Sequence, residues 1–526
     1  MRADLDPNST FRSDPPRVRL VAAFAAPFDN AVATARTCYT SRVVTPEDVA
    51  KDEDARALRD RIARSTYEAG HHTTLQHAHF QFTLENVSRQ ALWSFLHAHP
   101  FYNSEQVSQR YVAVKPGLVT LPEMPAPAAA RFDACVARMH ATYAELTALL
   151  LPVAAECFFQ VFPARRKSPD AWQGALKKKA QEVARYALPV ATHAHLYHTV
   201  SGLTLHRYHR LCLTGDVPAE TRLIVEAMVA EVNRHDPLFF REIEAVLDTP
   251  LGVAGRASET PRPRDPAAFV RAFDAALDGR TSRLVDWKVN AERTVADSVR
   301  EVLGLLPDEL DDDAAIARVL DPAKNPLFAE SLNLNTLDKL TRALHHPHYT
   351  FRKKLSHSAD SQYQRHRMTP GTRPLLAATF AGGREPDLVL PALLKAAPEA
   401  LELFEARMRE VWGVIEDLRS DGVSDEAALY LLPNAYPIRF EESGDLLYQH
   451  HKWTTRLCYN AQEEIWNATR DEVEQVRAVH PRLGRHLLPP CGLRAAAGRK
   501  PYCPEGPRFC GVPVWKLSPE DWHRVI

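Results

Sequence analysis

The chain has 526 residues, of which 45% are hydrophobic and 25% are charged, and its formal net charge is −1. This composition is typical of a globular protein with more than one domain, and the balanced charge excludes a general attraction to nucleic acid or to an anionic membrane surface. We expect no apolar run of the roughly 18 residues that a membrane helix needs and no export signal at the N-terminus. Eight cysteines are too few for a disulfide framework. These features predict a cytoplasmic protein that binds neither nucleic acid nor membrane.

The second half of the chain repeats features of the first. RLVAAFAAPFDNAVATA, from Arg19, resembles RLVDWKVNAERTVADSV, from Arg283, and ARYALPVATHAH, from Ala184, resembles ALYLLPNAYPIR, from Ala428. Self-similarity over this distance indicates two copies of one domain. We predict a first domain over 1–247, a Pro- and Gly-rich linker over 248–281, a second domain over 282–485 and a cysteine-containing tail over 486–526.

Each half predicts the same series of elements. An apolar strand, RVRLVAA or SRLVDWK, leads into a helix, and a histidine-rich turn then precedes a strand, which in the first half alternates as FQFTL. A loop with arginine or histidine residues and a long amphipathic helix follow. The order predicts an α+β fold in which each domain has an antiparallel sheet and long helices.

The chemistry of the chain is concentrated around Gln362 and Arg365-His366-Arg367. Two guanidinium forks beside an imidazole suit an anionic ligand with a planar polar ring, because arginine is permanently charged and donates to phosphate in pairs. The alternative is a basic turn that only faces water.

These residues carry a resemblance to a known family. The order H-x-T, Q-H, strand, S-R, Q-x-x-R-H-R, S-x-R-Y, R-x-x-L-P and finally R followed by A-Q-x-E-I is similar to that of flavin-dependent thymidylate synthases. The first half has S-x-R-Y, ending at Arg110-Tyr111, and R-x-x-L-P, from Arg185, but has His97 where the first arginine of R-H-R belongs. The second half has the opposite set, with R-H-R and Arg456 before A-Q-x-E-I.

The resemblance implies that neighbouring subunits of the family share each nucleotide pocket, so the two halves would form a pseudo-dimer with one complete, composite pocket. It implies three groups of residues. The catalytic candidates are Arg456 and Arg365; the nucleotide-binding candidates are Gln362, Ser108, Gln109, Arg110, Arg185 and Gln106; the flavin-binding candidates are His71, Thr73, Gln76, His366 and Arg367. The alternative for His71 and its neighbour is a polar turn that binds no ligand. The opposite pairing of the two halves would give a second pocket, which is expected to be inactive.

The tail adds Cys491, Cys503 and Cys510, which together with Cys458 or His486 could ligate zinc or an iron–sulfur cluster. Because the spacing contains no C-x-x-C pair, we expect unliganded thiols and no metal.

The function implied by the resemblance is C5-methylation of dUMP to dTMP, with FAD as cofactor and with methylenetetrahydrofolate and NADPH as co-substrates. Two chains are expected to pair as a homodimer that resembles the family's tetramer. The alternatives are a C5-methylase of another pyrimidine nucleotide, for which Gln106 in place of an acid is the cue, and a catalytically silent nucleotide-binding or regulatory protein.

Overall fold

The computed structural model describes residues 10–97, 99, 101–212, 217–241, 265–330, 334–383 and 385–524. The chain forms two compact units. Unit 1 comprises Met1–His140, Leu188–Pro263 and Gly413–Leu432, and unit 2 comprises Ala141–Ala187, Arg264–Trp412 and Pro433–Ile526. Each unit therefore contains most of one half of the chain and one segment from the other half.

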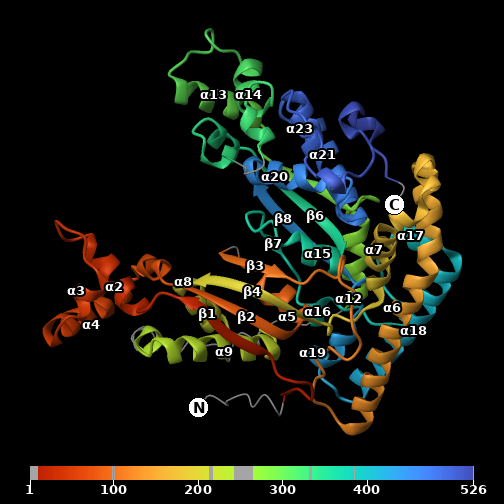
Figure 1. The fold of residues 1–526 in the computed structure, drawn as a ribbon, viewed down its shortest axis with the longest axis horizontal. Coiled ribbons are helices and arrows are strands. Elements are labelled where there is room, and N and C mark those ends of the chain that lie inside the picture. The colour runs from red at the N-terminus through yellow and green to blue at the C-terminus, as the bar shows by residue number, and fades with distance from the viewer. Residues whose placement is uncertain are drawn as a thin grey trace. The chain divides into compact units, whose positions relative to one another are not determined.

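Unit 1 is built around a four-stranded sheet with helices at its edges and on one face (Figure 1). Its described elements are β1 (Arg17–Ala23), α2 (Pro27–Thr37), α3 (Pro46–Ala50), α4 (Glu53–Glu68), η1 (His72–His77), β2 (His79–Ser88), α5 (Arg89–Ala91), the π-helical η2 (Leu92–Leu96), β3 (Tyr102–Gln106), the first part of α6 (Ala126–Val161), β4 (His193–Ser201), α8 (Gly202–Leu211), α9 (Ala219–His235), the end of α18 (Pro398–Ser420), α19 (Asp425–Ala428) and η9 (Leu429–Leu431).

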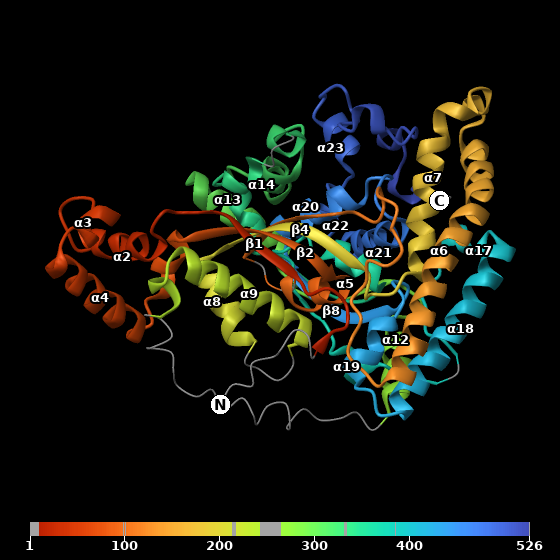
Figure 2. The same ribbon diagram turned by 60° about the horizontal axis from the view of Figure 1, so that its bottom comes forward.

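The strands of unit 1 run in the order β1-β2-β4-β3 and every neighbouring pair is antiparallel. Successive side chains of a strand point to opposite faces, so Phe80, Phe82 and Leu84 of β2 all enter the core. Helices α8 and α9 lie along this face and complete that core (Figure 2). The predicted strand at RVRLVAA is confirmed as β1.

Unit 2 repeats the sheet and adds more helices. Its described elements are the rest of α6, η3 (Pro163–Lys167), η4 (Pro169–Trp172), α7 (Gln173–Ala184), η5 (Arg185–Ala187), α12 (Pro266–Ala276), β5 (Ser282–Trp287), α13 (Ala291–Leu303), α14 (Asp312–Leu320), η6 (Pro326–Ala329), η7 (Leu334–Leu337), η8 (Thr341–His345), β6 (His348–Ser356), α15 (His357–Tyr363), β7 (Gly371–Thr372), α16 (Leu376–Thr379), α17 (Ala392–Lys395), most of α18, β8 (Pro437–Asp445), α20 (Leu446–Arg456), α21 (Glu463–Val479), α22 (Pro481–Gly484), α23 (Pro490–Ala496), η10 (Gly506–Arg508), η11 (Val514–Lys516) and η12 (Pro519–Asp521).

The sheet of unit 2 has the order β5-β6-β8-β7, again antiparallel. Its register matches that of unit 1 at the start of the strand, where His348 pairs with Asp445 as His79 pairs with Ser201, but the bulge of β2 between Leu84 and Val87 has no counterpart in β6. The two antiparallel sheets and the many helices confirm the predicted α+β class.

The two long helices confirm the predicted apolar stripes. In α6, apolar residues spaced three or four positions apart from Phe132 to Leu150 are all buried, as the helical period requires. In α18 the stripe is buried from Phe404 to Leu418, while Leu401 is only half-buried.

Helix α6 corrects one expectation from the sequence. An 18-residue window of it has a mean hydropathy of 1.4, which is long and apolar enough to cross a membrane, so the expectation that no such run exists is wrong. Only 22% of that window is buried. The exposed residues in this part of the helix include the alanines Ala144 and Ala148, which present little apolar surface, and also the larger Leu151 and Val161.

The predicted linker lies largely outside the described residues, which resume at Asp265. Asp265 caps α12 by accepting a hydrogen bond from the backbone N–H of Ala268 at 2.9 Å. Asp274 of α12 then pairs with Arg439 and Lys354, so this helix is tied to the sheet of unit 2.

Candidate functional site

The candidate site in unit 2 begins where β6 passes into α15. Ser356 caps α15, since its Oγ accepts a hydrogen bond from the backbone N–H of Ala359 at 3.1 Å. The Ser356 hydroxyl also donates to the buried carboxylate of Glu464, at 2.7 Å. This cap fixes the start of the helix that carries Gln362. The side-chain Oε1 of Gln362 is buried and has no hydrogen-bond partner among the described residues. A buried amide oxygen is costly to leave without a hydrogen bond, so water or a ligand is needed to complete it.

Arg456 ends α20 and joins this helix. Its Nε donates to Nε2 of His366 at 2.8 Å, and its Nη2 donates to the backbone carbonyl of Gln362 at 3.3 Å. Burial, and then the charge of Arg456, lowers the pKa of His366 well below its ordinary value. The imidazole is therefore neutral and accepts through Nε2, which leaves the proton on Nδ1. The contact holds the guanidinium of Arg456 beside Gln362.

Arg185 belongs to unit 2 although it comes from the first half of the chain. Its side chain is buried; Nη2 donates to Oε1 of Gln462 at 2.6 Å, and Nε donates to the carbonyl of Glu182 at 3.2 Å. Gln462 in turn donates to the hydroxyl of Tyr186 at 2.6 Å, and Tyr186 donates to Glu464 at 2.5 Å. Arg185 is thus connected to the segment that follows Arg456.

Beneath α15 lies a buried ion network that the sequence interpretation missed. Lys353 lies 3.0 Å from Glu442 and 2.8 Å from Glu472, and Lys452 contacts both carboxylates. The hydroxyl of Tyr363, in α15, donates to Glu472 at 3.2 Å. Burial opposes ionisation of Glu472, but the two lysines outweigh it and lower its pKa to about 2. Two cations and two anions cancel, so the network is tolerated in the core and fixes α15 from below.

A sequence signal for this network existed. In FRKKLS, strand alternation places Lys353 on the same face as Phe351 and Leu355, which are core residues. An inward-facing lysine requires a buried acid.

The other members of R-H-R lie on the loop after α15. Arg365 is exposed and Arg367 is half-buried. The arginine of the second half's altered S-x-R-Y stretch, Arg373, forms a two-point ion pair with buried Asp360, each contact 2.7 Å long. Its charge is therefore neutralised within unit 2.

The remaining nucleotide-binding candidates are in unit 1. Gln106 ends β3 and accepts from Arg89 at 3.1 Å, and the Oγ of Ser108 accepts from the backbone N–H of Arg110 at 3.2 Å. Gln109 is buried, and the guanidinium of Arg110 lies 5.4 Å from the ring centre of Tyr111. This short turn keeps its hydroxyl, amide and guanidinium groups close together.

The flavin-binding candidates of the first half lie on the short helix η1 of unit 1 and on the residue before it. His71, Thr73 and Gln76 are all exposed, so their polar groups face solvent. His366 and Arg367, the other two, are in unit 2 with Arg456.

Where unit 2 has R-H-R, unit 1 has aromatic packing. The ring of His97 stacks on Tyr102 with centres 5.1 Å apart and planes within 2°, and its Nε2 lies 3.3 Å from the hydroxyl of Ser104. The preceding turn is π-helical, which accommodates one extra residue in this loop.

The described residues contain no group of three or more His, Cys, Asp or Glu placed to hold a single metal ion.

Comparison with known proteins gives one family. A family model described as thymidylate synthase complementing protein matches residues 19–238 and again 283–482. A protein of Geobacter sulfurreducens named flavin-dependent thymidylate synthase is 28% identical over 225 residues, which cover 40% of this chain and 93% of the relative. Relatives with the same name from Sulfurisphaera tokodaii and Saccharolobus solfataricus are 31% and 30% identical, over 28% of this chain each. The chain spans little more than half the length of these two, 57% and 56%.

Proposed function

Since the chain belongs to the thymidylate synthase complementing protein family, we propose that it is a flavin-dependent methyltransferase that converts dUMP to dTMP. The observation that carries this proposal is the contact of Arg456 with His366 and Gln362 in unit 2. It places a permanent cation at the backbone of the residue whose buried side-chain amide oxygen has no hydrogen-bond partner within the described part of the chain.

The pyrimidine ring would bind at Gln362, whose amide offers both a donor and an acceptor to the uracil edge. Arg456 would face the negative charge that develops on the ring as electron density moves to C5, and a preorganised cation in a water-poor site stabilises such charge strongly. The neutral His366 holds Arg456 in place without competing for an anion. Arg365, on the adjoining loop, is the second catalytic candidate.

The phosphate would be bound by guanidinium and hydroxyl groups. Arg185 is present in unit 2, and the proposal adds Ser108, Gln109, Arg110 and Gln106 from the first half, so that the two halves act as a pseudo-dimer with one composite pocket. We expect pairs of chains to form a homodimer in the cytoplasm.

The residues proposed for FAD fit a polar cofactor. His71, Thr73 and Gln76 present exposed polar groups, and His366 and Arg367 supply an imidazole and a guanidinium, which suit the ring edge and the pyrophosphate. A bound flavin supplies the hydride chemistry of the reaction. The chain's own groups bind and orient the nucleotide, with methylenetetrahydrofolate and NADPH as the proposed co-substrates.

The test combines binding and turnover. Calorimetric titration of the purified protein with dUMP, UMP and dCMP should show the tightest binding for dUMP, and dTMP should form only when FAD, methylenetetrahydrofolate and NADPH are all present. Binding of dUMP without any methylated product would favour the silent, nucleotide-binding alternative. Methylation of UMP in preference to dUMP would favour the other C5-methylase. Complementation of a thymidine auxotroph gives an independent readout.

A further inference from the structure

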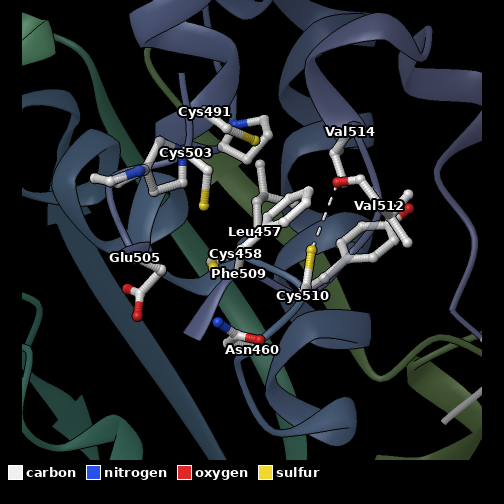
Figure 3. A pocket seen from close by; sticks show the side chains of 14 residues that line it. Leu457, Cys458, Asn460, Cys491, Cys503, Glu505, Phe509, Cys510, Val512 and Val514 are labelled. Carbon is white, nitrogen blue, oxygen red and sulfur yellow. Dashed lines mark hydrogen bonds between the residues drawn. The ribbon is translucent and has the colours of Figure 1, made fainter. Parts of the chain in front are cut away.

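Unit 2 contains a small, partly open hollow between the segment after α20 and the C-terminal tail. Four cysteines from four separate points of the chain line it: Cys458, Cys491, Cys503 and Cys510 (Figure 3). The rest of the lining is mainly apolar and consists of Leu457, Tyr459, Pro489, Pro490, Pro504, Phe509, Val512 and Val514, with Asn460 and Glu505 as the polar members. Half of the chain's eight cysteines thus meet in one place.

The four thiols are free and influence one another. Burial, followed by the nearby thiols of Cys458, Cys503 and Cys510, raises the pKa of Cys491 to about 12. Burial likewise raises the pKa of Cys458 to about 11, partly offset by a backbone hydrogen bond from Asn460. Four close thiols in an apolar hollow are the ligand set of a thiophilic metal centre, because thiolates select zinc or iron–sulfur clusters.

The arrangement of the four cysteines differs from that of a single-ion site. Tetrahedral zinc holds sulfurs about 2.3 Å from the metal, and hence roughly 3.8 Å from one another. No three such ligands among the described residues are grouped around one ion position. A cubane cluster takes one thiolate at each of four corners and separates the sulfurs more widely, which agrees with four cysteines that surround a hollow rather than a point.

The surroundings also suit a cluster. Cluster sites carry net negative charge and are tuned by hydrogen bonds to the sulfurs. Burial raises the pKa of the Cys510 thiol, and the positive charge of Arg524, which donates to the carbonyl of Ala461 at 2.6 Å, offsets a small part of that rise. Gly511, beside Cys510, has a φ of 94°, and a Cβ there would meet Arg165 at 2.5 Å, so a tight glycine turn directs this cysteine.

We propose that Cys458, Cys491, Cys503 and Cys510 bind a [4Fe–4S] cluster. It would join the tail to the segment after α20, since Cys458 follows Arg456 by two positions and the three other ligands are in the tail. This inference does not depend on the proposed methylation, because the cluster is detected by its own iron and sulfide.

The experiment uses the full chain purified without oxygen and reconstituted with iron and sulfide. We expect about four iron atoms and four acid-labile sulfides per chain, with a broad absorption near 400 nm that dithionite bleaches. Chemical iron and sulfide assays separate this signal from any flavin absorbance. The double variant Cys491→Ala/Cys510→Ala should retain less than a quarter of the iron. The matched control Cys157→Ala removes a thiol of α6 that does not line the hollow and should retain all of it.

Two results would overturn the proposal. One is a single zinc ion per chain by mass spectrometry of metals, and the other is no metal after anaerobic reconstitution. If the double variant fails to fold, Cys503→Ala alone, checked by circular dichroism, serves instead; unchanged iron in that folded variant would also contradict the cluster. Loss of methylation with iron intact would count against the proposed function alone.

Discussion

The two sheets have the same strand order, but different residues fill their centres. Tyr186 in the first half corresponds to Tyr430 in the second. At the same separation along the chain, the counterparts of His198, Tyr208 and Met228 are Glu442, Lys452 and Glu472. Leu84 lies opposite Leu196 in the sheet of unit 1, and Lys353 lies opposite Phe440, the counterpart of Leu196, in the sheet of unit 2. Leu84 and Lys353 are therefore the fourth pair of corresponding residues. Unit 1 fills its centre with apolar and aromatic groups, whereas unit 2 fills the same positions with four charges.

One buried arrangement is common to both units. Glu220 accepts from the hydroxyl of Ser88 at 2.5 Å and from that of Tyr430 at 2.7 Å; Glu464 accepts in the same way from Ser356 and Tyr186. The capped helix after the second strand is thus held alike in both units. The difference begins beneath that helix, so the two halves share a scaffold and have diverged where a ligand would be met.

The largest effect should come from unbalancing the ion network. Glu472→Met gives unit 2 the residue of unit 1 and leaves Lys353 and Lys452 with a single buried carboxylate. We expect a loss of about 3–5 kcal/mol in the free energy of unfolding, measured by urea denaturation. Lys353→Leu combined with Glu472→Met restores the charge balance and should recover most of that loss. A double variant no more stable than the single one would show that the charges do not act as a set.

Next in size is the effect on turnover. Arg456→Ala and Arg365→Ala should each lower kcat about 100- to 1,000-fold, because each removes a cation proposed to stabilise the transition state. His97→Ala, at the corresponding loop of unit 1, should leave kcat unchanged. Turnover is measured as dTMP formed per minute. Equal losses in all three variants would contradict the proposal that only one half supplies the catalytic cations.

The shared arrangement offers a matched pair. Tyr186→Phe and Tyr430→Phe each remove one hydrogen bond to a buried carboxylate, and each should cost about 1.5–3 kcal/mol of stability. Only Tyr186→Phe should also weaken dUMP binding, because Tyr186 positions Gln462, which holds Arg185. Calorimetry on both variants tests this: equal affinities for dUMP would mean that Arg185 needs no such support.

The smallest expected effect is on pH dependence. Burial, followed by His209 and His72, lowers the pKa of His206 to about 3, so this ring is neutral when folded. The unfolded chain takes up a proton below about pH 6.5, so this contribution to stability is full above that pH and declines as the pH falls toward 3. His206→Phe, which keeps the stacking on Phe239, should lessen the loss of stability between pH 7.5 and 5.5 by about 1.4 kcal/mol. The exposed His79, changed to Gln, is the control and should leave the slope of melting temperature against pH as it is.

The sequence carried much of the fold because its signals are local. Strand alternation located β2, the short segments RVRLVAA and SRLVDWK located β1 and β5, and the 3.6-residue period located the buried faces of α6 and α18. The exchange of segments between units was not predictable, since nothing in the residues of 141–187 specifies which sheet they join. The domain boundaries inferred from the sequence therefore stay a prediction.

The sequence motif selected candidate residues that lie together in the structure, although their role in binding stays a prediction, whereas the buried charged residues were not selected. Arg456, His366 and Gln362 were selected from the motif, and the structure places them in contact. Lys353 and Glu472 were not, because a charged residue is ordinarily a surface residue. Cys458 was only one possible companion of the tail cysteines, since 32 residues lie between it and Cys491 and only the fold brings them together.

The exchanged tyrosines have a consequence for how this protein can be divided. Cutting the chain near residue 260 would separate Glu220 from Tyr430 and Glu464 from Tyr186. Each fragment would then contain a buried glutamate that has lost its hydrogen bond from a tyrosine hydroxyl. Neither fragment would close its own interior. The two halves have diverged in sequence, but each supplies a tyrosine that completes a buried hydrogen bond in the other.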